Sequence, residues 1–199
     1  MADPAVLQYW DSVVFISYLT GTDPDRTKVV QTLLRHVEQG KIRLATSTFT
    51  IAEVRYFTTD QTAARRNNPD REKRIEELFE SDQIEFRAVT DFIAREARQI
   101  GCTYNQLSPA DCVHIASAVD VGAAVLLTWD GASPSGKRAP DKMLTHSQLI
   151  GTPPLEIVVP YDPWPSLGLS DGDIGQATTF ALPGGTLPLS EQSPAAPGD

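Results

Sequence analysis

Short apolar segments alternate with helical patterns along most of this chain, and that alternation limits the fold more than any other feature. The segments between them have apolar residues at helical spacing, and several begin with a capping residue or end at a glycine. The strand-like segments lie at 7–10, 42–45, 84–89, 124–129 and 155–159. Strands that alternate with helices favour parallel pairing, because each crossover helix returns the chain to the same end of the sheet. We therefore predict a three-layer α/β/α sandwich with a mostly parallel central sheet.

Four acidic residues occupy positions where such a sheet collects ligands. Asp11 and Asp130 directly follow strand-like segments, Asp111 lies at the start of a predicted helix, and Glu53 lies within another. Ligands of open parallel sheets bind at the carboxyl ends of the strands. Converging carboxylates repel one another unless a cation neutralises them, and Mg²⁺ and Mn²⁺ prefer oxygen ligands. The set predicts a divalent metal site suited to phosphodiester hydrolysis.

Each acid also has an ordinary structural explanation when it is taken alone. Asp11 can cap the helix that follows it, and Asp111 occupies the N3 position of a capping box. Asp130 followed by Gly131 is a common turn dipeptide, and Glu53 can lie on an exposed helix face. The metal-site hypothesis therefore depends on the set and not on any single member.

The distribution of charge divides the 199-residue chain in two. Of the net charge of −9, the segment 160–199 carries −5, because it holds five acidic residues and no Lys or Arg. That segment is rich in Pro, Gly and Ser, so we predict a largely disordered acidic tail after a domain at 1–159. The remaining −4 argues against broad electrostatic binding of nucleic acid, but metal-site carboxylates account for it and leave an RNA substrate open.

No segment of the sequence predicts a membrane or secreted location. No apolar run approaches the roughly 20 residues of a membrane-spanning helix, and the N-terminus lacks a basic segment followed by an apolar one. Cys102 and Cys112 have no partners at metal-site spacing. We expect a cytoplasmic protein that does not contact a membrane.

The motifs around the four acids resemble those of PIN domains, and the resemblance extends over residues 6–159. Their order and spacing are similar to those of VapC-like toxins of type II toxin–antitoxin modules. The motifs are Tyr9-Trp10-Asp11-Ser12, the segment 47–54 around Glu53, Ser108-Pro109-Ala110-Asp111 with the apolar helix to 118, and Leu127-Thr128-Trp129-Asp130.

The resemblance implies a metal-dependent endoribonuclease that uses Mg²⁺ or Mn²⁺ to cleave RNA. It assigns the catalytic and metal-binding roles to Asp11, Glu53, Asp111 and Asp130. It gives auxiliary roles to two hydroxyl side chains, with Thr128 orienting water or a carboxylate and Ser12 next to the first acid. It also implies a homodimer and a cognate antitoxin protein whose C-terminal segment enters the groove.

Two departures from the family pattern keep a second function open. Many relatives have Ser, Thr or Asn where this chain has Val13, and a second acid soon after the last Asp where this chain has Gly131-Ala132-Ser133. Asp141 is a candidate replacement for that acid from beyond the loop. The alternative is a catalytically weak or inactive PIN-like domain that binds RNA or a protein partner. A phosphatase-type hydrolase is a weaker hypothesis, because it requires an acid at position 13.

Other polar residues carry weaker signals. The segment 131–138 resembles a phosphate-binding loop, but Arg138 stands where that motif needs Ser or Thr. Lys137 and Arg138 are candidate contacts to an RNA phosphate, or else part of a solvated loop. The basic residues between 65 and 74 alternate with acids, which favours a solvated helical face. For His114, we predict a packed core histidine and not a metal ligand.

Overall fold

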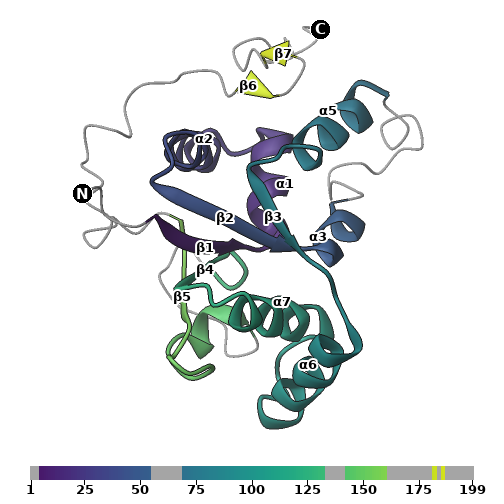
Figure 1. Ribbon diagram of the computed structural model, residues 1–199, viewed down its shortest axis with the longest axis vertical. Helices are drawn as coiled ribbons and strands as arrows, with labels where there is room; N and C mark the ends of the chain where they lie inside the picture. The colour runs from purple at the N-terminus through teal and green to yellow at the C-terminus, as the bar shows by residue number, and fades with distance from the viewer. Residues whose placement is uncertain (1–4, 55–68, 133–141, 161–180, 183–184, 187–199) are drawn as a thin grey trace, which may run out of the picture.

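The computed structural model describes residues 5–54, 69–132, 142–160, 181–182 and 185–186, and these form helices and strands in alternation (Figure 1). The strands are β1 (Val6–Trp10), β2 (Ile42–Ser47), β3 (Ile84–Arg87), β4 (Val125–Leu127), β5 (Glu156–Val158), β6 (Ala181–Leu182) and β7 (Gly185–Thr186). The helices are α1 (Ser12–Thr20), α2 (Pro24–Glu38), α3 (Thr48–Glu53), α5 (Pro69–Phe79), α6 (Asp91–Thr103), α7 (Pro109–Asp120) and the 3₁₀ helix η1 (Met143–His146).

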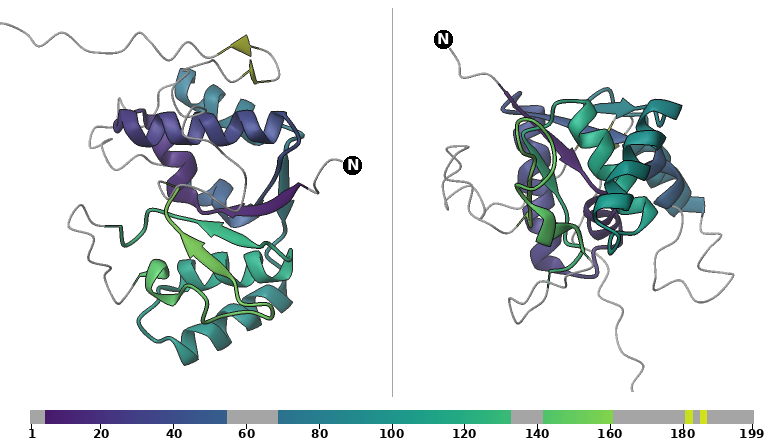
Figure 2. Two further views of the ribbon diagram at one scale, coloured as in Figure 1. Left: turned by 90° about the vertical axis from the view of Figure 1, so that its left-hand side faces the viewer. Right: turned by 90° about the horizontal axis from the view of Figure 1, so that it is seen from below.

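Among the described strands, β1 to β5 form one parallel sheet in the order β3-β2-β1-β4-β5. β1 lies at its centre, where Tyr9 pairs with Ala45 of β2 and Leu126 of β4. Helices α1, α2 and α5 lie on one side of the sheet, and α6 and α7 lie on the other (Figures 1 and 2). The predicted α/β/α sandwich with a parallel central sheet is therefore confirmed.

The two faces of the sheet are covered by separate apolar clusters because successive residues of a strand point to opposite faces. In β1, Trp10 packs in the cluster that contains Phe15 of α1, whereas Tyr9 packs with Ile93 of α6 and Ile115 of α7. All five side chains are at most 1% exposed. Burying one large apolar side chain contributes roughly 1.5–3 kcal/mol, so β1 is a principal source of stability for both layers.

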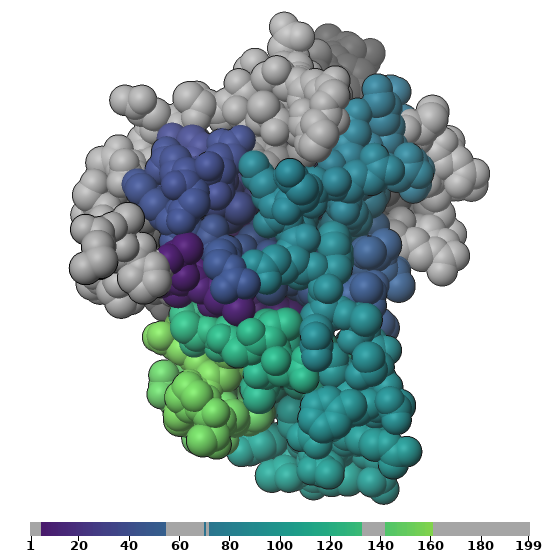
Figure 3. All heavy atoms as spheres, in the orientation of Figure 1, coloured from purple at the N-terminus to yellow at the C-terminus, as the bar shows by residue number. Residues whose placement is uncertain are grey.

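In the space-filling view, the N-terminal segment that includes β1 shows only a small dark purple area between the blue and green segments (Figure 3). No helix in the described part of the chain is both long and apolar enough to span a bilayer. In the predicted tail, β6 and β7 pair as a short antiparallel ladder. The prediction of disorder for the rest of the tail after residue 160 concerns residues outside the described ones.

The two cysteines differ in burial, and we expect them to differ in reactivity. Cys102 of α6 is exposed, whereas Cys112 of α7 is buried. Burial and the nearby charge of Asp111 raise the pKa of the Cys112 thiol, which leaves less of the reactive thiolate. A thiol-specific chromogenic reagent at pH 8 is expected to modify Cys102 alone in the folded chain and both cysteines in denaturant. Rapid modification of both in the folded chain would contradict this placement.

Candidate metal centre

Asp11 lies at the carboxyl end of the central strand β1 and begins α1. Its backbone N–H donates to the carbonyl oxygen of Leu127 in β4. Oδ1 accepts hydrogen bonds from the backbone N–H of Ser12 (2.6 Å) and from the Ser12 hydroxyl (3.2 Å). Oδ2 accepts one from Thr128 Oγ1 (2.7 Å). The carboxylate thus caps α1 while it lies buried at the edge of the sheet where ligands collect.

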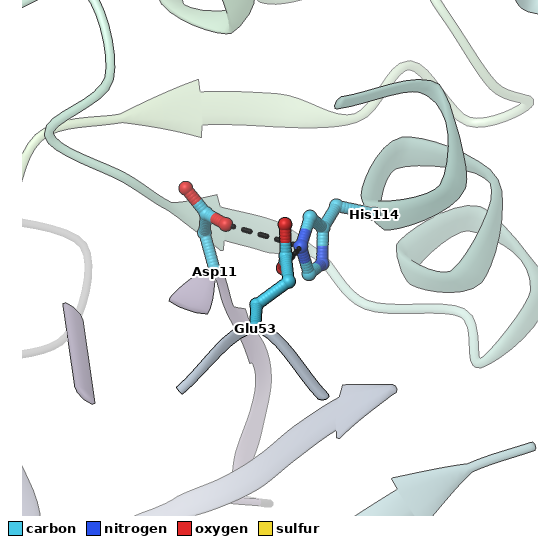
Figure 4. Close-up of side chains that lie close together, drawn as sticks. All are labelled: Asp11, Glu53 and His114. Carbon is cyan, nitrogen blue, oxygen red and sulfur yellow. Dashed lines mark hydrogen bonds and ion pairs between the residues drawn. The ribbon is translucent and has the colours of Figure 1, made fainter. Parts of the chain in front are cut away.

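Glu53 and His114 approach Asp11 from two other helices (Figure 4). Glu53 is the last residue of α3, and its Oε2 lies 2.6 Å from Nε2 of His114 on α7. The same Nε2 lies 3.3 Å from Asp11 Oδ1. One ligand atom from each of the three residues falls within 4.8 Å of the others. The structure therefore places two of the four predicted acids and one histidine in a single cluster.

Burial and the neighbouring charges determine the protonation of this cluster. Burial raises the pKa of Asp11, and the Glu53 charge adds to that rise, while His114 and Thr128 oppose it. Burial alone lowers the pKa of His114, but the Asp11 charge and the Glu53 hydrogen bond outweigh it and raise that pKa to about 10. At neutral pH the imidazole ring is therefore protonated on both nitrogens, and its single positive charge offsets part of the negative charge of the two acids.

Both ring nitrogens of the protonated His114 form hydrogen bonds. Nε2 donates to Glu53 Oε2, and Nδ1 donates to the hydroxyl oxygen of Tyr9, 2.9 Å away. The rings of Tyr9 and Phe49 also pack against it. His114 is buried, as a core histidine would be, but its contact with both acids was not predicted. A signal was present in the sequence, because the i,i+3 spacing from Asp111 places both residues on one face of α7.

Asp111 lies in the first turn of α7 and does not belong to the three-residue cluster among the described residues. Its Oδ2 accepts a hydrogen bond from the Ser108 N–H (3.0 Å), and its own N–H donates to Ser108 Oγ (3.2 Å). This is the capping box that the sequence predicted. Burial, followed by the charge of Asp130, raises the pKa of the Asp111 carboxyl, while Lys142 and the Ser108 hydrogen bonds lower it.

Asp130 follows β4 and is partly exposed. Its Oδ1 lies 3.2 Å from Nζ of Lys142. Its backbone N–H donates to Thr128 Oγ1 (2.9 Å), and the same hydroxyl donates to Asp11. Thr128 is fully buried, so one side chain links the backbone of the last acid to the carboxylate of the first.

The donor set fits a hard divalent cation. Two carboxylates face the same point, where their like charges require a cation, and the charged ring of His114 fills that role in the absence of metal. Asp11 and Glu53 offer the oxygen ligands that Mg²⁺ and Mn²⁺ prefer. Among the other predicted residues, Val13 packs against the core and offers no polar group. Lys137, Arg138 and Asp141 lie outside the described residues.

Two solved structures resemble this chain weakly. The crystal structure of VapBC2 from Rickettsia felis bound to a DNA fragment from their promoter shares 10% sequence identity, with a TM-score of 0.45, over 62% of this chain and 87% of that chain. The structure of FitAB bound to the IR36 DNA fragment shares 17% identity, with a TM-score of 0.48, over 78% of this chain and 96% of that chain. At this level of likeness, neither bears on the activity. No curated protein matches the chain.

The sequence model of the PIN domain matches residues 9–132, which is more than half of the chain. The matched region begins beside Asp11 and ends just after Asp130. It therefore contains the end of β1, all of β2 to β4, every member of the three-residue cluster, and both acids outside that cluster. The chain belongs to the PIN domain family.

Proposed function

We propose that this chain is a Mg²⁺- or Mn²⁺-dependent endoribonuclease and the VapC-like toxin of a toxin–antitoxin pair. The observation that carries the proposal is the convergence of Asp11 and Glu53 on His114 at the carboxyl edge of the sheet, in a chain of the PIN family. PIN domains are generally nucleases, and RNA is the substrate that the motif resemblance favours. The partners we propose are an RNA substrate, a cognate antitoxin and a second copy of the chain, in the cytoplasm.

Asp11 and Glu53 would hold the principal ion, with Asp111 as a further ligand and Asp130 as a ligand or an anchor. When bound, the ion supplies Lewis acidity and an activated water to phosphodiester hydrolysis. Thr128 and Ser12 fix the direction of the Asp11 carboxylate through their hydrogen bonds. Lys137 and Arg138 stay candidate contacts to the RNA phosphates.

A direct test is to incubate the purified full-length chain, free of co-purified protein, with total RNA and Mn²⁺ or Mg²⁺. We expect discrete fragments that are absent with EDTA and absent with the Asp11→Asn variant. A wild-type chain that binds Mn²⁺ and RNA but leaves every RNA intact would contradict the proposal. It would favour the second candidate, a PIN-like domain that binds without cleaving, which the apolar packing of Val13 supports.

Thr128→Val offers a test of the hydroxyl link, because valine keeps the shape of the side chain and removes its oxygen. Asp11 Oδ2 then loses its buried donor, and the Asp130 N–H loses its acceptor. Loss of such an orienting group typically weakens metal affinity or activity about 10–100-fold. We expect a loss of this size in cleavage rate at subsaturating Mn²⁺. Thr32→Val is the matched control, at a buried threonine of α2 that, among the described residues, donates to Lys28 O and accepts from Arg35.

A further inference from the structure

A lysine side chain lies against the acidic edge of the site. Lys142 directly precedes η1, and its Nζ lies 3.2 Å from Asp130 Oδ1. Both side chains are partly exposed, at 39% and 29%. An ion pair of this exposure contributes little to stability, so its position beside the predicted metal-site acids points to a role in the charge balance there.

The backbone at Gly131 leaves room for the side chain of Lys142 to approach Asp130. A Cβ added at Gly131 would lie 2.5 Å from Cβ of Lys142 and 3.1 Å from its Cγ. The residue also has a φ of +89°, which L side chains rarely adopt. Any acid at 131 would therefore displace Lys142. At position 131, the first of the three positions after Asp130 where the chain lacks a second acid, the stem of a lysine occupies the space that a side chain would need.

The charge of Lys142 extends beyond Asp130. Beside the effect of burial, the negative charge of Asp130 raises the pKa of the Asp111 carboxyl, and the positive charge of Lys142 lowers that pKa. These two acids lie outside the Asp11–Glu53–His114 cluster, so the positive charge of His114 is not shared directly with them. In the described part of the site, Lys142 forms an ion pair with Asp130, and its charge also lowers the pKa of Asp111.

We propose that the ammonium group of Lys142 takes the place of a second metal ion, so that the chain holds one divalent ion instead of two. Lys142 is thus a positioning residue for Asp130 and a resident counter-charge for Asp111. This inference rests on the proposed metal site at Asp11 and Glu53. It concerns how many ions the chain binds and not whether it cleaves RNA.

The test counts Mn²⁺ ions bound to the full-length chain in the absence of RNA, by electron paramagnetic resonance of free Mn²⁺ and by titration calorimetry. We expect one ion per wild-type chain. Lys142→Met keeps the Cβ and Cγ that lie on Gly131 and removes only the charge, so we expect two ions, the second weaker. Lys142→Gln serves the same purpose if the methionine variant does not fold. Lys142→Arg restores the charge and is expected to bind one ion.

The matched control is Lys73→Met, which removes a lysine paired with Glu77 on α5 and is expected to leave one ion bound. Two ions on the wild-type chain would overturn the inference. So would one ion on a folded Lys142→Met or Lys142→Gln variant, and in either case the proposed nuclease would be unaffected. A wild-type chain that binds no Mn²⁺ would overturn both this inference and the proposed metal site.

Discussion

Asp11→Asn is expected to lower the rate of metal-dependent RNA cleavage at least about 100-fold while the chain stays folded. Asparagine keeps the shape of the side chain but carries no negative charge, so the attraction for a divalent cation falls. The hydrogen bonds survive the change. The amide oxygen can accept from the Ser12 N–H, and the NH₂ group can donate to the second lone pair of Thr128 Oγ1.

The chain offers a matched control for this substitution. Asp23 also caps a helix, accepting hydrogen bonds from the N–H groups of Asp25 and Arg26. Asparagine is as good an N-cap as aspartate, so Asp23→Asn makes the same chemical change away from the cluster and should leave cleavage unchanged. Initial rates with a fluorescent RNA, together with thermal melting curves, separate the two variants. Wild-type cleavage by Asp11→Asn would remove Asp11 from the metal-site hypothesis.

The sequence predicted the fold because its short apolar strand segments and its helical spacing of apolar residues are both strong patterns. Tyr9 and Trp10 are adjacent apolar residues that need two covered faces, and a parallel sheet between helical layers provides them. The capping box of Ser108 and Asp111 was equally predictable from the sequence, since it depends only on residues three positions apart. β4 is shorter than the predicted 124–129, because the chain turns at Thr128, whose hydroxyl accepts from the Asp130 N–H.

The contacts of the site were less predictable, because they join residues that only the complete fold brings together. His114 meets Glu53 across 61 positions of sequence, and nothing local to either residue specifies that approach. Lys142 lies beyond the 131–138 loop, in which the sequence predicted Lys137 and Arg138 as the basic residues near the site. The sequence shows only that no acid stands at 131–133, whereas the structure shows that a side chain at 131 would clash with a lysine eleven positions later. The catalytic and metal-binding roles of Asp11, Glu53, Asp111 and Asp130 stay predictions.

His114→Leu is expected to destabilise the metal-free chain by about 3 kcal/mol, in the range for breaking a buried ion pair. Leucine fills the space, but Asp11 and Glu53 then face one another without a positive charge. For a chain of this length, the loss lowers Tm by roughly 6–12 °C. His146→Leu is the control, because it removes another buried histidine, one that packs on Tyr104 instead of these acids.

The pH dependence gives this prediction a signature that simple loss of packing lacks. Because the pKa of His114 is raised from 6.5 to about 10, its pairing with the acids stabilises the folded chain fully below pH 6.5. That stabilisation is lost as pH rises toward 10. Denaturant unfolding of the metal-free chain at pH 6 and pH 9 should show a smaller difference in unfolding free energy for His114→Leu than for wild type.

Metal addition completes the test of His114, because the protonated ring and a divalent ion neutralise the same two carboxylates. In the wild-type chain the ion must compete with that ring, so part of its binding energy replaces an existing interaction. In His114→Leu no such interaction is lost, and saturating Mn²⁺ is expected to raise Tm by more than it does in wild type. A smaller rise in the variant would instead make His114 a ligand of the ion, which its position 2.6 Å from Glu53 also permits.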